Sequence, residues 1–539
     1  MPLSYDPCQR TFPCSRSVQF ARRGMVCTSQ PLAAQAGLDV LRQGGNAIDA
    51  AVAAAACMTV LEPVSNSLGS DCFAIVFSGG QLYGLNGSGP SPAALSLCSL
   101  LQAGYRKMPQ KGWLPVMVPG APQAWAQLQQ RFGCLPLSRL LEPAAAYAEE
   151  GFPVSPVISR LWERAVQSAL KSPPENSPGF QEWLRVFAPQ GRAPRAGEIW
   201  SSPAHAATLR ELGETGCESL YRGRLAEEID RFSRRTGGTL RADDLKDFSA
   251  EWVSPIHADY RGYTVWELPP NGHGLTALMA LQILEGFSLS EREDVETVHR
   301  QIEAMKLALT DGMRYIADPR FMKARVEELL SPAYIARRRA LIGSRALLPQ
   351  AGDPFCGGTI YLCTADREGN MVSLIQSSYL DFGAHLVVPG TGIALNNRGC
   401  NFSLNPQMEN CAGPGKRSYH TIIPGFLTKD GQPLGPFGVM GAFMQPQGHL
   451  QLISNLIDFQ MNPQEALDAP RWQWTQGREI MLEPGFPQAV ARQLSERGHL
   501  ITTAADSLSF GRGQLIVRGE NGVLAGATEP RTDGTVACW

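Results

Sequence analysis

The part of the sequence most clearly suited to catalysis is a pair of glycines followed by a threonine. The run Cys356-Gly357-Gly358-Thr359 gives a flexible and uncrowded backbone at the peptide bond before the threonine. If that bond is cleaved, Thr359 carries a free α-amine beside its own hydroxyl, and an amine with a pKa of about 7.7–8.0 can accept the hydroxyl proton near neutral pH. Cys356 would remain at the end of the upstream chain, which argues against a cysteine nucleophile. The pattern indicates a threonine nucleophile, although Gly-Gly-Thr before a strand is also an ordinary structural turn.

A second hydroxyl is expected to lie beside the first. The β-branched and aromatic run 359–365 predicts a strand, and the run 371–378 predicts its antiparallel partner. With a three-residue connecting loop, Thr359 lies opposite Ser377, and directly opposed residues of an antiparallel pair point to the same face. We therefore expect Ser377 to orient the Thr359 hydroxyl, whereas a two-residue loop would place Ser378 there instead.

The elements that must position these residues alternate between helices and strands. Apolar residues at helical spacing predict a helix over 31–43 that stops at Gly44, and Asn46 is expected to cap an Ala-rich helix that continues through Val60. A strand hairpin is expected over 74–85. The remaining predicted helices include 225–235, 295–317, 449–459 and 487–498, and the remaining predicted strands cover 263–268, 422–427 and 435–442. Helices before and after two sets of strands predict a layered α/β/β/α body.

The composition excludes several classes of protein. Among 539 residues, 48 Lys and Arg balance 50 Asp and Glu, so the basic surplus of a nucleic-acid binder is missing. The longest apolar run, Ala50–Leu61, is shorter than the ~20 residues of a membrane-spanning helix, and the N-terminal segment lacks the apolar core of a signal peptide. Thirteen cysteines without a Cys-x-x-Cys pair favour free thiols. We therefore expect a cytoplasmic protein of one compact unit that binds neither nucleic acid nor membrane.

Motifs spread along the chain add a further signal. They are Gly44-Gly45-Asn46-Ala47-Ile48-Asp49-Ala50-Ala51, Glu62-Pro63, Val118-Pro119-Gly120, Asp259-Tyr260-Arg261-Gly262-Tyr263, Pro269-Pro270, Asp318-Pro319 with Phe321, Asp366 with Gly369-Asn370, Gly392-Ile393, Asn396-Asn397, Pro414 with Lys416-Arg417 and, in part, Glu529-Pro530-Arg531. With these motifs the chain resembles, nearly end to end, the γ-glutamyltransferase family of N-terminal-nucleophile hydrolases. The resemblance implies an α/β fold, a four-layer αββα sandwich with additional helices from the large chain. It also implies a precursor cleaved between Gly358 and Thr359 into a large chain, residues 1–358, and a small chain, residues 359–539, which form one compact unit.

The resemblance also implies roles for catalytic residues. Thr359 matches the nucleophile, and Ser377 matches the hydroxyl residue that holds it. Gly441 and Ala442 match a pair, usually Gly-Gly, whose backbone N–H groups form the oxyanion hole, and an alanine can still donate its N–H. Without the family, the run 438–442 is simply a Gly-rich strand end.

The departures from the family pattern concern the substrate. The family's glutamyl-binding Arg falls at Ser88, and the acidic partner of the substrate α-amine falls at Asn401. Two serines that help to hold the substrate carboxylate are His420 and Thr421 here, and His420 serves either binding or packing. Because a hydroxyl does not replace a bidentate Arg–carboxylate pair, this pattern resembles the branch that contains oxamate amidohydrolase and the glutathione-hydrolase-like bacterial relatives.

These features together predict an autoprocessing amidohydrolase. Thr359 is expected to form an acyl-enzyme that water hydrolyses, without a metal or organic cofactor, and the expected substrate is a small-molecule amide such as oxamate. γ-Glutamyl hydrolysis or transfer on glutathione is the alternative within enzymes. A non-catalytic binding protein that keeps the fold is a third possibility, although such a protein has no need to split. A homo-oligomer is compatible with the sequence.

Overall fold

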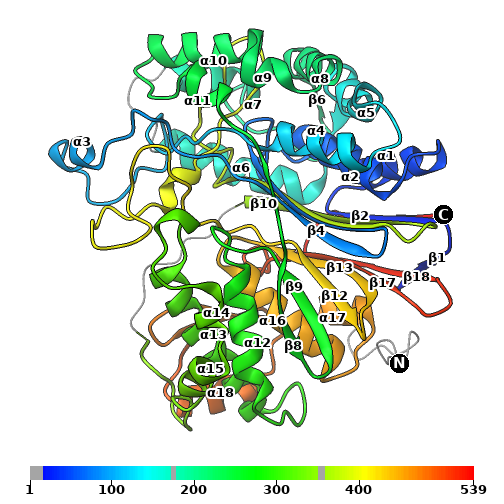
Figure 1. Ribbon diagram of the computed structural model, residues 1–539, viewed down its shortest axis with the longest axis vertical. Coiled ribbons are helices and arrows are strands. Elements are labelled where there is room, and N and C mark those ends of the chain that lie inside the picture. The colour runs from blue at the N-terminus through cyan, green and yellow to red at the C-terminus, as the bar shows by residue number, and fades with distance from the viewer. Residues whose placement is uncertain (1–15, 172–177, 350–357) are drawn as a thin grey trace.

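The computed structural model describes residues 16–171, 178–349 and 358–539, so that Cys356 and Gly357 lie outside the described residues (Figure 1). Two seven-stranded sheets face each other, and helices cover their outer faces, as Figure 1 shows. The predicted four-layer αββα sandwich is therefore confirmed. Every strand pair within the two large sheets is antiparallel.

The strands occur in a fixed order in each sheet. The first sheet runs β1 (Gln19–Ala21), β18 (Leu524–Thr528), β17 (Arg512–Arg518), β13 (Gln432–Met440), β12 (Gly425–Lys429), β9 (Tyr263–Glu267) and β8 (Ile256–Tyr260). The second sheet runs β19 (Thr535–Cys538), β2 (Gly24–Thr28), β10 (Gly358–Asp366), β11 (Met371–Tyr379), β3 (Asp71–Ser78), β4 (Gln81–Gly87) and β7 (Glu251–Val253). Two small sheets join β14 (Trp472–Gln476), β15 (Glu479–Leu482) and β16 (Leu500–Thr503), and β5 (Phe152–Pro153) with β6 (Ile199–Trp200).

The helices form two outer layers. Above the second sheet in Figure 1 lie α1 (Pro31–Arg42), α2 (Ala47–Leu61), α4 (Ala121–Phe132), α5 (Leu137–Glu150), α6 (Pro156–Lys171), α7 (Pro178–Phe187), α8 (Pro203–Thr215), α9 (Glu218–Arg222), α10 (Arg224–Arg235) and α11 (Ala242–Lys246). Below the first sheet lie α12 (Gly274–Glu285), α13 (Val295–Tyr315), α14 (Val326–Leu329), α15 (Pro332–Arg339), α16 (Met444–Ile457), α17 (Pro463–Asp468) and α18 (Gln488–Glu496). The short α3 (Leu97–Gln102) projects at the side, and the two 3₁₀ turns are η1 (Pro319–Phe321) and η2 (Arg398–Asn401).

Helix α2 supports the strand on which the predicted nucleophile lies. Asn46 caps it in a reciprocal capping box with Asp49, as its sequence predicts. All of its residues are buried, because small side chains let the helix approach β10 and β11 closely. The Thr364 hydroxyl donates to the Ala47 carbonyl at 2.7 Å, and Asp366 accepts the Ala47 N–H at 2.9 Å. These bonds fix the start of α2 to the far end of β10.

Most predicted elements are present, and the differences have local causes. The expected strand over 422–427 begins only at Gly425, because Pro424 has no N–H for a ladder hydrogen bond. The expected helix over 449–459 begins earlier, at Met444, since Pro446 occupies the first turn, where a missing N–H is tolerated. The hairpin over 74–85 is confirmed and extends back to Asp71.

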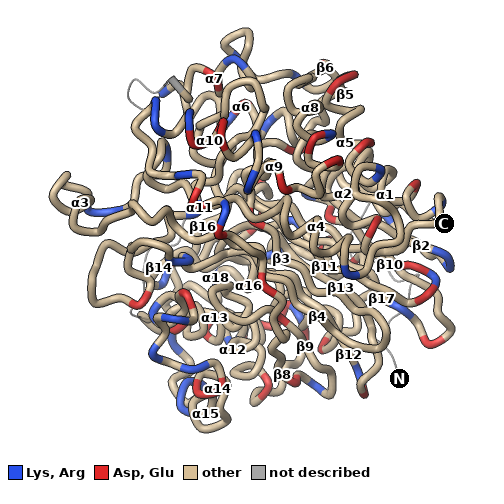
Figure 2. The backbone as a smooth tube through the Cα atoms, turned by 45° about the horizontal axis from the view of Figure 1, so that its top comes forward, with Lys and Arg blue, Asp and Glu red and all other residues tan. Residues whose placement is uncertain are grey.

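Among the described residues, basic and acidic residues are mixed along the chain (Figure 2). Figure 2 shows Lys and Arg interspersed with Asp and Glu over the outer helices and loops, while the two sheets carry few charges. Among the described residues, no helix is both long and apolar enough to span a membrane. The ten described cysteines form no disulfide with one another, and about half of them are buried.

Candidate active site

Four strand ends meet at one edge of the second sheet, because β10, β11, β3 and β4 are successive antiparallel neighbours. Ser377 of β11 pairs with Asp71 of β3, and Ser88 follows the last residue of β4. Thr359 is the second residue of β10 and lies at the same edge. This edge therefore gathers the predicted nucleophile, its hydroxyl partner and one predicted substrate-binding position.

The hydroxyl of Thr359 donates to the Ser377 hydroxyl oxygen at 3.1 Å, and Thr359 is only 1% exposed. The strand register is the one that a three-residue loop predicts, with Asp366 donating its N–H to the Asn370 carbonyl. The predicted contact is therefore confirmed, while the catalytic role of Ser377 stays a prediction. The N–H of Tyr379 also donates to the Ser377 oxygen, at 2.8 Å, which holds the hydroxyl in place.

The Thr359–Ser377 pair faces the layer between the two sheets. Along β10, Ile360 packs on the helical side, whereas Tyr361 packs into the layer between the sheets. Ser377 follows Ile375 at the two-residue spacing of one strand face, and Ile375 belongs to the layer between the sheets. A bulge at the start of β10 shifts the register there, and bulges re-aim side chains next to active sites.

The predicted oxyanion hole follows β13 of the facing sheet. This strand packs close to β10, since a Cβ on Gly438 would lie 2.4 Å from the Tyr361 ring. Gly441 and Ala442 come next, with φ values of +136° and +51°, and lead into α16. A non-glycine residue at such a left-handed φ costs roughly 1–2 kcal/mol, which explains the usual Gly-Gly of the family. Backbone N–H groups at the start of a helix favour negative charge, as an oxyanion hole requires.

Asp71 is the centre of a buried hydrogen-bond network at this edge. Its carboxylate lies 2.9 Å from Nε2 of His420 and accepts the Arg398 Nε–H at 3.2 Å and the Gly89 N–H at 3.4 Å. The other ring nitrogen of His420 accepts the Ile422 N–H at 3.4 Å. Both nitrogens of His420 are therefore occupied, which favours packing over substrate binding for this residue. Burial lowers the pKa of His420 to about 4, with a further lowering by Arg398 and an opposing effect of Asp71.

The hydroxyl of Ser88 is likewise occupied. It donates to the side-chain oxygen of Asn86 at 2.7 Å and lies 3.2 Å from that of Asn271. Asn271 in turn donates to the Ser418 carbonyl at 2.9 Å and accepts the His420 N–H through its own carbonyl. Ser88 thus joins the end of β4 to the segment that carries His420.

The guanidinium of Arg398 is the charged group that the sequence analysis missed. It is 1% exposed, its Nη1 donates to the Thr421 hydroxyl at 2.8 Å, and it lies 4.6 Å from the ring centroid of Tyr379. Its Nη2 is buried and has no hydrogen-bond acceptor among the described residues. Burial lowers the pKa of Arg398, against the opposing effect of Asp71. Arg398 therefore adds to this buried network a cation that Ser88 and Asn401 do not supply.

Asn401 lies on the same face of η2 as Arg398, because side chains three residues apart eclipse on a 3₁₀ helix. Its Nδ2 is also buried without an acceptor in the described part of the chain. Among the described residues, η2 thus carries two buried N–H donors without an acceptor, on Arg398 and Asn401, and such donors are suited to a carboxylate. One feature of the sequence could have identified Arg398. It is a charged residue that directly follows the family's Asn-Asn pair and comes three residues before Asn401, a predicted substrate-binding position.

The comparisons with known proteins agree with this fold. The family model described as gamma-glutamyltranspeptidase matches residues 33–539. The chain therefore belongs to the gamma-glutamyltranspeptidase family, as the motifs predict, and it is an autoprocessing amidohydrolase or acylase of the N-terminal-nucleophile class.

Individual relatives match nearly the full length of the chain. It is 35% identical to the glutathione hydrolase-like YwrD proenzyme of Bacillus subtilis, over 95% of this chain and 97% of the relative. It is also 35% identical to the oxamate amidohydrolase proenzyme of Klebsiella pneumoniae subsp. pneumoniae, over 97% and 99% of the two chains. Among solved structures, the crystal structure of cephalosporin acylase from Bacillus halodurans has 55% sequence identity and a TM-score of 0.95, with 99% of each chain covered.

Proposed function

We propose that this enzyme hydrolyses amides whose acyl group carries a carboxylate but no α-ammonium, with oxamate as the leading candidate. The precursor is cleaved between Gly358 and Thr359, and Thr359 becomes the N-terminal nucleophile of the small chain. The observation that carries the substrate class is the pair of buried N–H donors on Arg398 and Asn401.

The proposed reaction uses a single hydroxyl and its own amine. The α-amine of Thr359 accepts the hydroxyl proton, and the oxygen attacks the amide carbonyl to form a C–O bond. The N–H groups of Gly441 and Ala442 stabilise the tetrahedral oxyanion, and its collapse breaks the C–N bond while the amine returns the proton to the leaving nitrogen. Water then attacks the ester, with the same amine as base, and releases the acid. Ser377 keeps the nucleophile in the attacking orientation.

The charges around the pocket support this choice of acyl group. A carboxylate meets the buried cation of Arg398 and the amide N–H of Asn401. An α-ammonium finds no free carboxylate among the described residues of this network, because Asp71 already lies within hydrogen-bond distance of three nitrogens. A buried charge without a partner costs several kcal/mol. Oxamate is the smallest amide of this class, since its carboxylate is next to the scissile carbonyl.

Two alternatives rest on specific observations. γ-Glutamyl hydrolysis or transfer on glutathione is supported by the likeness to a glutathione hydrolase-like proenzyme. Hydrolysis of an amide with a larger amine as leaving group is supported by the 55% identity to a protein described as a cephalosporin acylase. All three use the same nucleophile and differ in the acyl and leaving groups.

The test is amide hydrolysis by the purified, cleaved protein with matched substrates. Glutaramate and L-glutamine differ only in the α-ammonium, and succinamate and butyramide differ in the carboxylate. We expect ammonia release from oxamate. We also expect kcat/KM to be at least about tenfold higher for succinamate than for butyramide, and at least about tenfold higher for glutaramate than for L-glutamine. Glutaryl and γ-glutamyl anilides repeat the comparison with a larger leaving group.

The outcomes separate the alternatives. Strong turnover of glutathione or of the γ-glutamyl anilide would overturn the proposed acyl group. Turnover of the glutaryl anilide without ammonia release from any small amide would favour the acylase alternative. A single-chain protein on a denaturing gel, inactive on every substrate, would favour a non-catalytic binding protein.

A further inference from the structure

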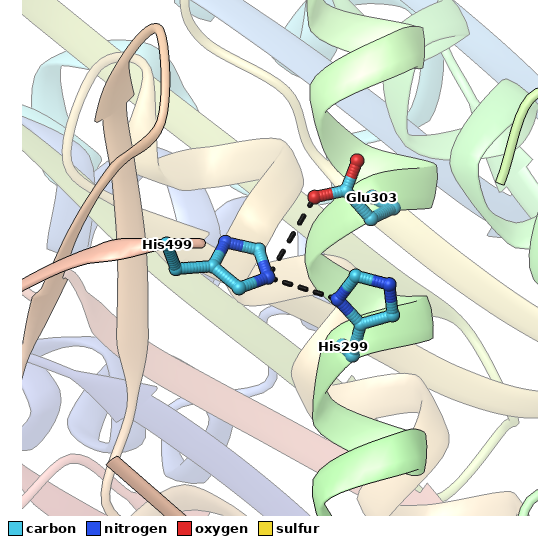
Figure 3. A group of neighbouring side chains, drawn as sticks. All are labelled: His299, Glu303 and His499. Atoms are coloured by element: carbon cyan, nitrogen blue, oxygen red, sulfur yellow. Dashed lines mark hydrogen bonds and ion pairs between the residues drawn. The ribbon is translucent and has the colours of Figure 1, made fainter. Parts of the chain in front are cut away.

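Four buried titratable side chains form a polar cluster on the side of the molecule covered by α13. His299, Glu303 and Lys306 lie on one face of α13 at successive helical spacings, and His499 precedes β16 (Figure 3). Each of the four is buried. Figure 3 shows His499 pointing at both His299 and Glu303. None of these four side chains is used in the proposed reaction.

The hydrogen bonds of the cluster define where every proton lies. Nε2 of His299 lies 2.8 Å from the Gly343 carbonyl, so this nitrogen carries a proton and Nδ1 of a neutral ring accepts. The bond of 2.9 Å between Nδ1 of His299 and Nε2 of His499 therefore has His499 as donor. Nδ1 of His499 then accepts from the Lys306 ammonium at 3.4 Å, and Lys306 also donates to Glu303 at 2.7 Å. Burial lowers the pKa of both histidines, that of His499 to about 2, which agrees with two neutral rings.

The same bonds argue against a metal ion at this cluster. Two imidazoles and a carboxylate within 4.8 Å of one another are a ligand set that Zn²⁺ can use. Here the Nδ1 lone pair of His299 accepts a proton from His499, and the Nε2 of His499 is protonated. The ammonium of Lys306 adds a positive charge at 2.7 Å from the carboxylate of Glu303. The cluster is a closed hydrogen-bond network in which every one of these ligand atoms is already used.

What the network holds is the segment 343–347, here called the upstream arm. His299 binds the Gly343 carbonyl, Glu303 accepts the Leu347 N–H at 3.1 Å, and Lys306 donates to the Leu347 carbonyl at 3.4 Å. On its other side the upstream arm contacts the segment 496–499. The N–H of Ala346 donates to the Arg497 carbonyl at 2.8 Å, and Arg345 donates to the Glu496 carbonyl at 2.9 Å.

The arrangement joins parts of the chain that the proposed cleavage would separate. Helix α13 and the upstream arm belong to the proposed large chain, whereas the segment 496–499 belongs to the proposed small chain. Leu347 lies twelve residues before Thr359, and β10 holds the chain again from Gly358. In the sequence, the segment 348–357 thus lies between the upstream arm and β10, whose first two residues form the proposed scissile bond.

We propose that His299, Glu303, Lys306 and His499 form an interchain clasp that positions the upstream arm for cleavage of the precursor. Intramolecular attack by Thr359 needs the preceding carbonyl in a near-attack geometry, and fixing both ends of a connection raises the population of that geometry. The clasp rests on the proposed cleavage at Gly358–Thr359. None of the hydrogen bonds of the clasp given above involves Asp71, so we expect the activity of the finished enzyme to be independent of the clasp.

The test compares three substitutions of buried histidines. H499L removes the donor to His299 and the acceptor for Lys306, whereas H499Q offers one donor and one acceptor and should restore both. H205L removes a histidine that is buried in α8, 3.2 Å from the Thr59 hydroxyl, far along the chain from the upstream arm. We expect H499L to cleave about tenfold more slowly than wild type, with H499Q and H205L close to wild type. Once cleaved, all three should match the wild-type kcat.

Two readouts keep the clasp and the proposed function separate. The first is the time course of cleavage on a denaturing gel, and the second is amide exchange at Ala346 and Leu347, which should become faster in H499L alone. Cleavage of H499L at the wild-type rate, or equal slowing by H205L, would overturn the clasp. A wild-type chain that never splits would overturn the proposed cleavage, and unchanged exchange in H499L would then overturn the clasp as well.

Discussion

Two buried arginines in this protein differ in how completely they are bound. Arg531 makes five hydrogen bonds, to both oxygens of Glu483, to Glu529 and to the carbonyls of Leu467 and Ala469. A guanidinium has five N–H donors, so this set is complete. Arg398 has bonds to Asp71 and Thr421, while its Nη2 has no acceptor among the described residues.

The pKa values of the two arginines shift in opposite directions. Burial lowers the pKa of both, but Glu529 and Glu483 outweigh burial at Arg531 and raise its pKa above the ordinary value. At Arg398 burial outweighs Asp71, and the pKa is lowered. An arginine whose N–H donors are all bound and whose charge is balanced by two carboxylates has a structural role. An arginine with one N–H group that lacks an acceptor is suited to bind an anion. The comparison therefore distinguishes a structural ion network from the proposed recognition site.

Removing the proposed nucleophile gives the largest expected effect. It tests whether the sheet edge at which Thr359, Ser377 and Asp71 lie is an active site. Thr359→Ala should remain a single chain, because attack on the preceding carbonyl needs the hydroxyl. Wild type should show two bands, by proportion of 58.5 kDa roughly 39 kDa and roughly 20 kDa, the smaller with Thr359 first. Amide hydrolysis should fall by on the order of 10⁴-fold or more.

Thr364→Ala is the matched control on the same strand. Thr364 is buried in β10 and donates to the Ala47 carbonyl, so its loss should affect stability and leave cleavage intact. The decisive measurement is a denaturing gel with N-terminal sequencing. An intact and fully active single chain of wild type would contradict the mechanism.

Paired substitutions of the two arginines test the comparison directly. Arg398→Met should lower kcat/KM for succinamate by about 10²–10³-fold while butyramide hydrolysis changes little, because the charged anchor of the carboxylate is gone. Arg531→Met should instead leave Glu483 and Glu529 as buried charges with lost partners, at a cost of about 3–5 kcal/mol in the free energy of unfolding. Asp71 would keep His420 and Gly89 as partners, so Arg398→Met should cost less stability.

The measurements are steady-state kinetics on the two amides and denaturant unfolding of both variants. Equal loss of activity on succinamate and butyramide in Arg398→Met would contradict a role in recognition. A loss of carboxylate preference in a folded Arg531→Met protein would remove the distinction between the two networks.

The sequence predicts the scaffold well and the pocket only in part. Hairpin registers follow from loop length and strand alternation, so residues 359–378 alone predict a contact of Thr359 with Ser377 or Ser378. The family pattern selects Ser377, which is the contact observed. The start of α2 at Asn46 and the family motifs are similarly local. Arg398 was not predicted, because its role depends on burial and on the absence of an acceptor at Nη2, and these are set by segments far apart in the chain.

A smaller effect is expected from the residue that orients the nucleophile. Ser377→Ala should slow cleavage and turnover by roughly ten- to hundredfold, since one positioning hydrogen bond contributes on the order of 1–3 kcal/mol. The carboxylate preference should not change, because Arg398 is untouched. Ser378→Ala is the control, as the Ser378 side-chain oxygen has no hydrogen-bond partner among the described residues. A larger loss in Ser378→Ala than in Ser377→Ala would show that the wrong hydroxyl was chosen.

The smallest expected effect is a difference in pH dependence between the two networks. The pKa of His420 is lowered to about 4, first by burial and then by Arg398, whereas an unfolded imidazole titrates near 6.5. Between these values the unfolded chain binds a proton that the folded chain excludes, so the free energy of unfolding falls as the pH falls. One such proton changes it by about 1.4 kcal/mol per pH unit. His420→Asn should reduce the slope by that amount.

The network of Arg531 should respond in a lower pH window. Burial raises the pKa of Glu529, but Arg471 and Arg531 outweigh it and hold the pKa below the ordinary value of 4.5. The stability that this carboxylate contributes is present above pH 4.5 and is lost only as the pH falls below it. Denaturant unfolding at intervals from pH 7 to about pH 2 would check both windows. Because the other buried histidines contribute equally to wild type and His420→Asn, the difference between the two curves isolates one proton. If the unfolding free energies of wild type and His420→Asn run parallel between pH 6.5 and 4.5, the lowered pKa of His420 is contradicted.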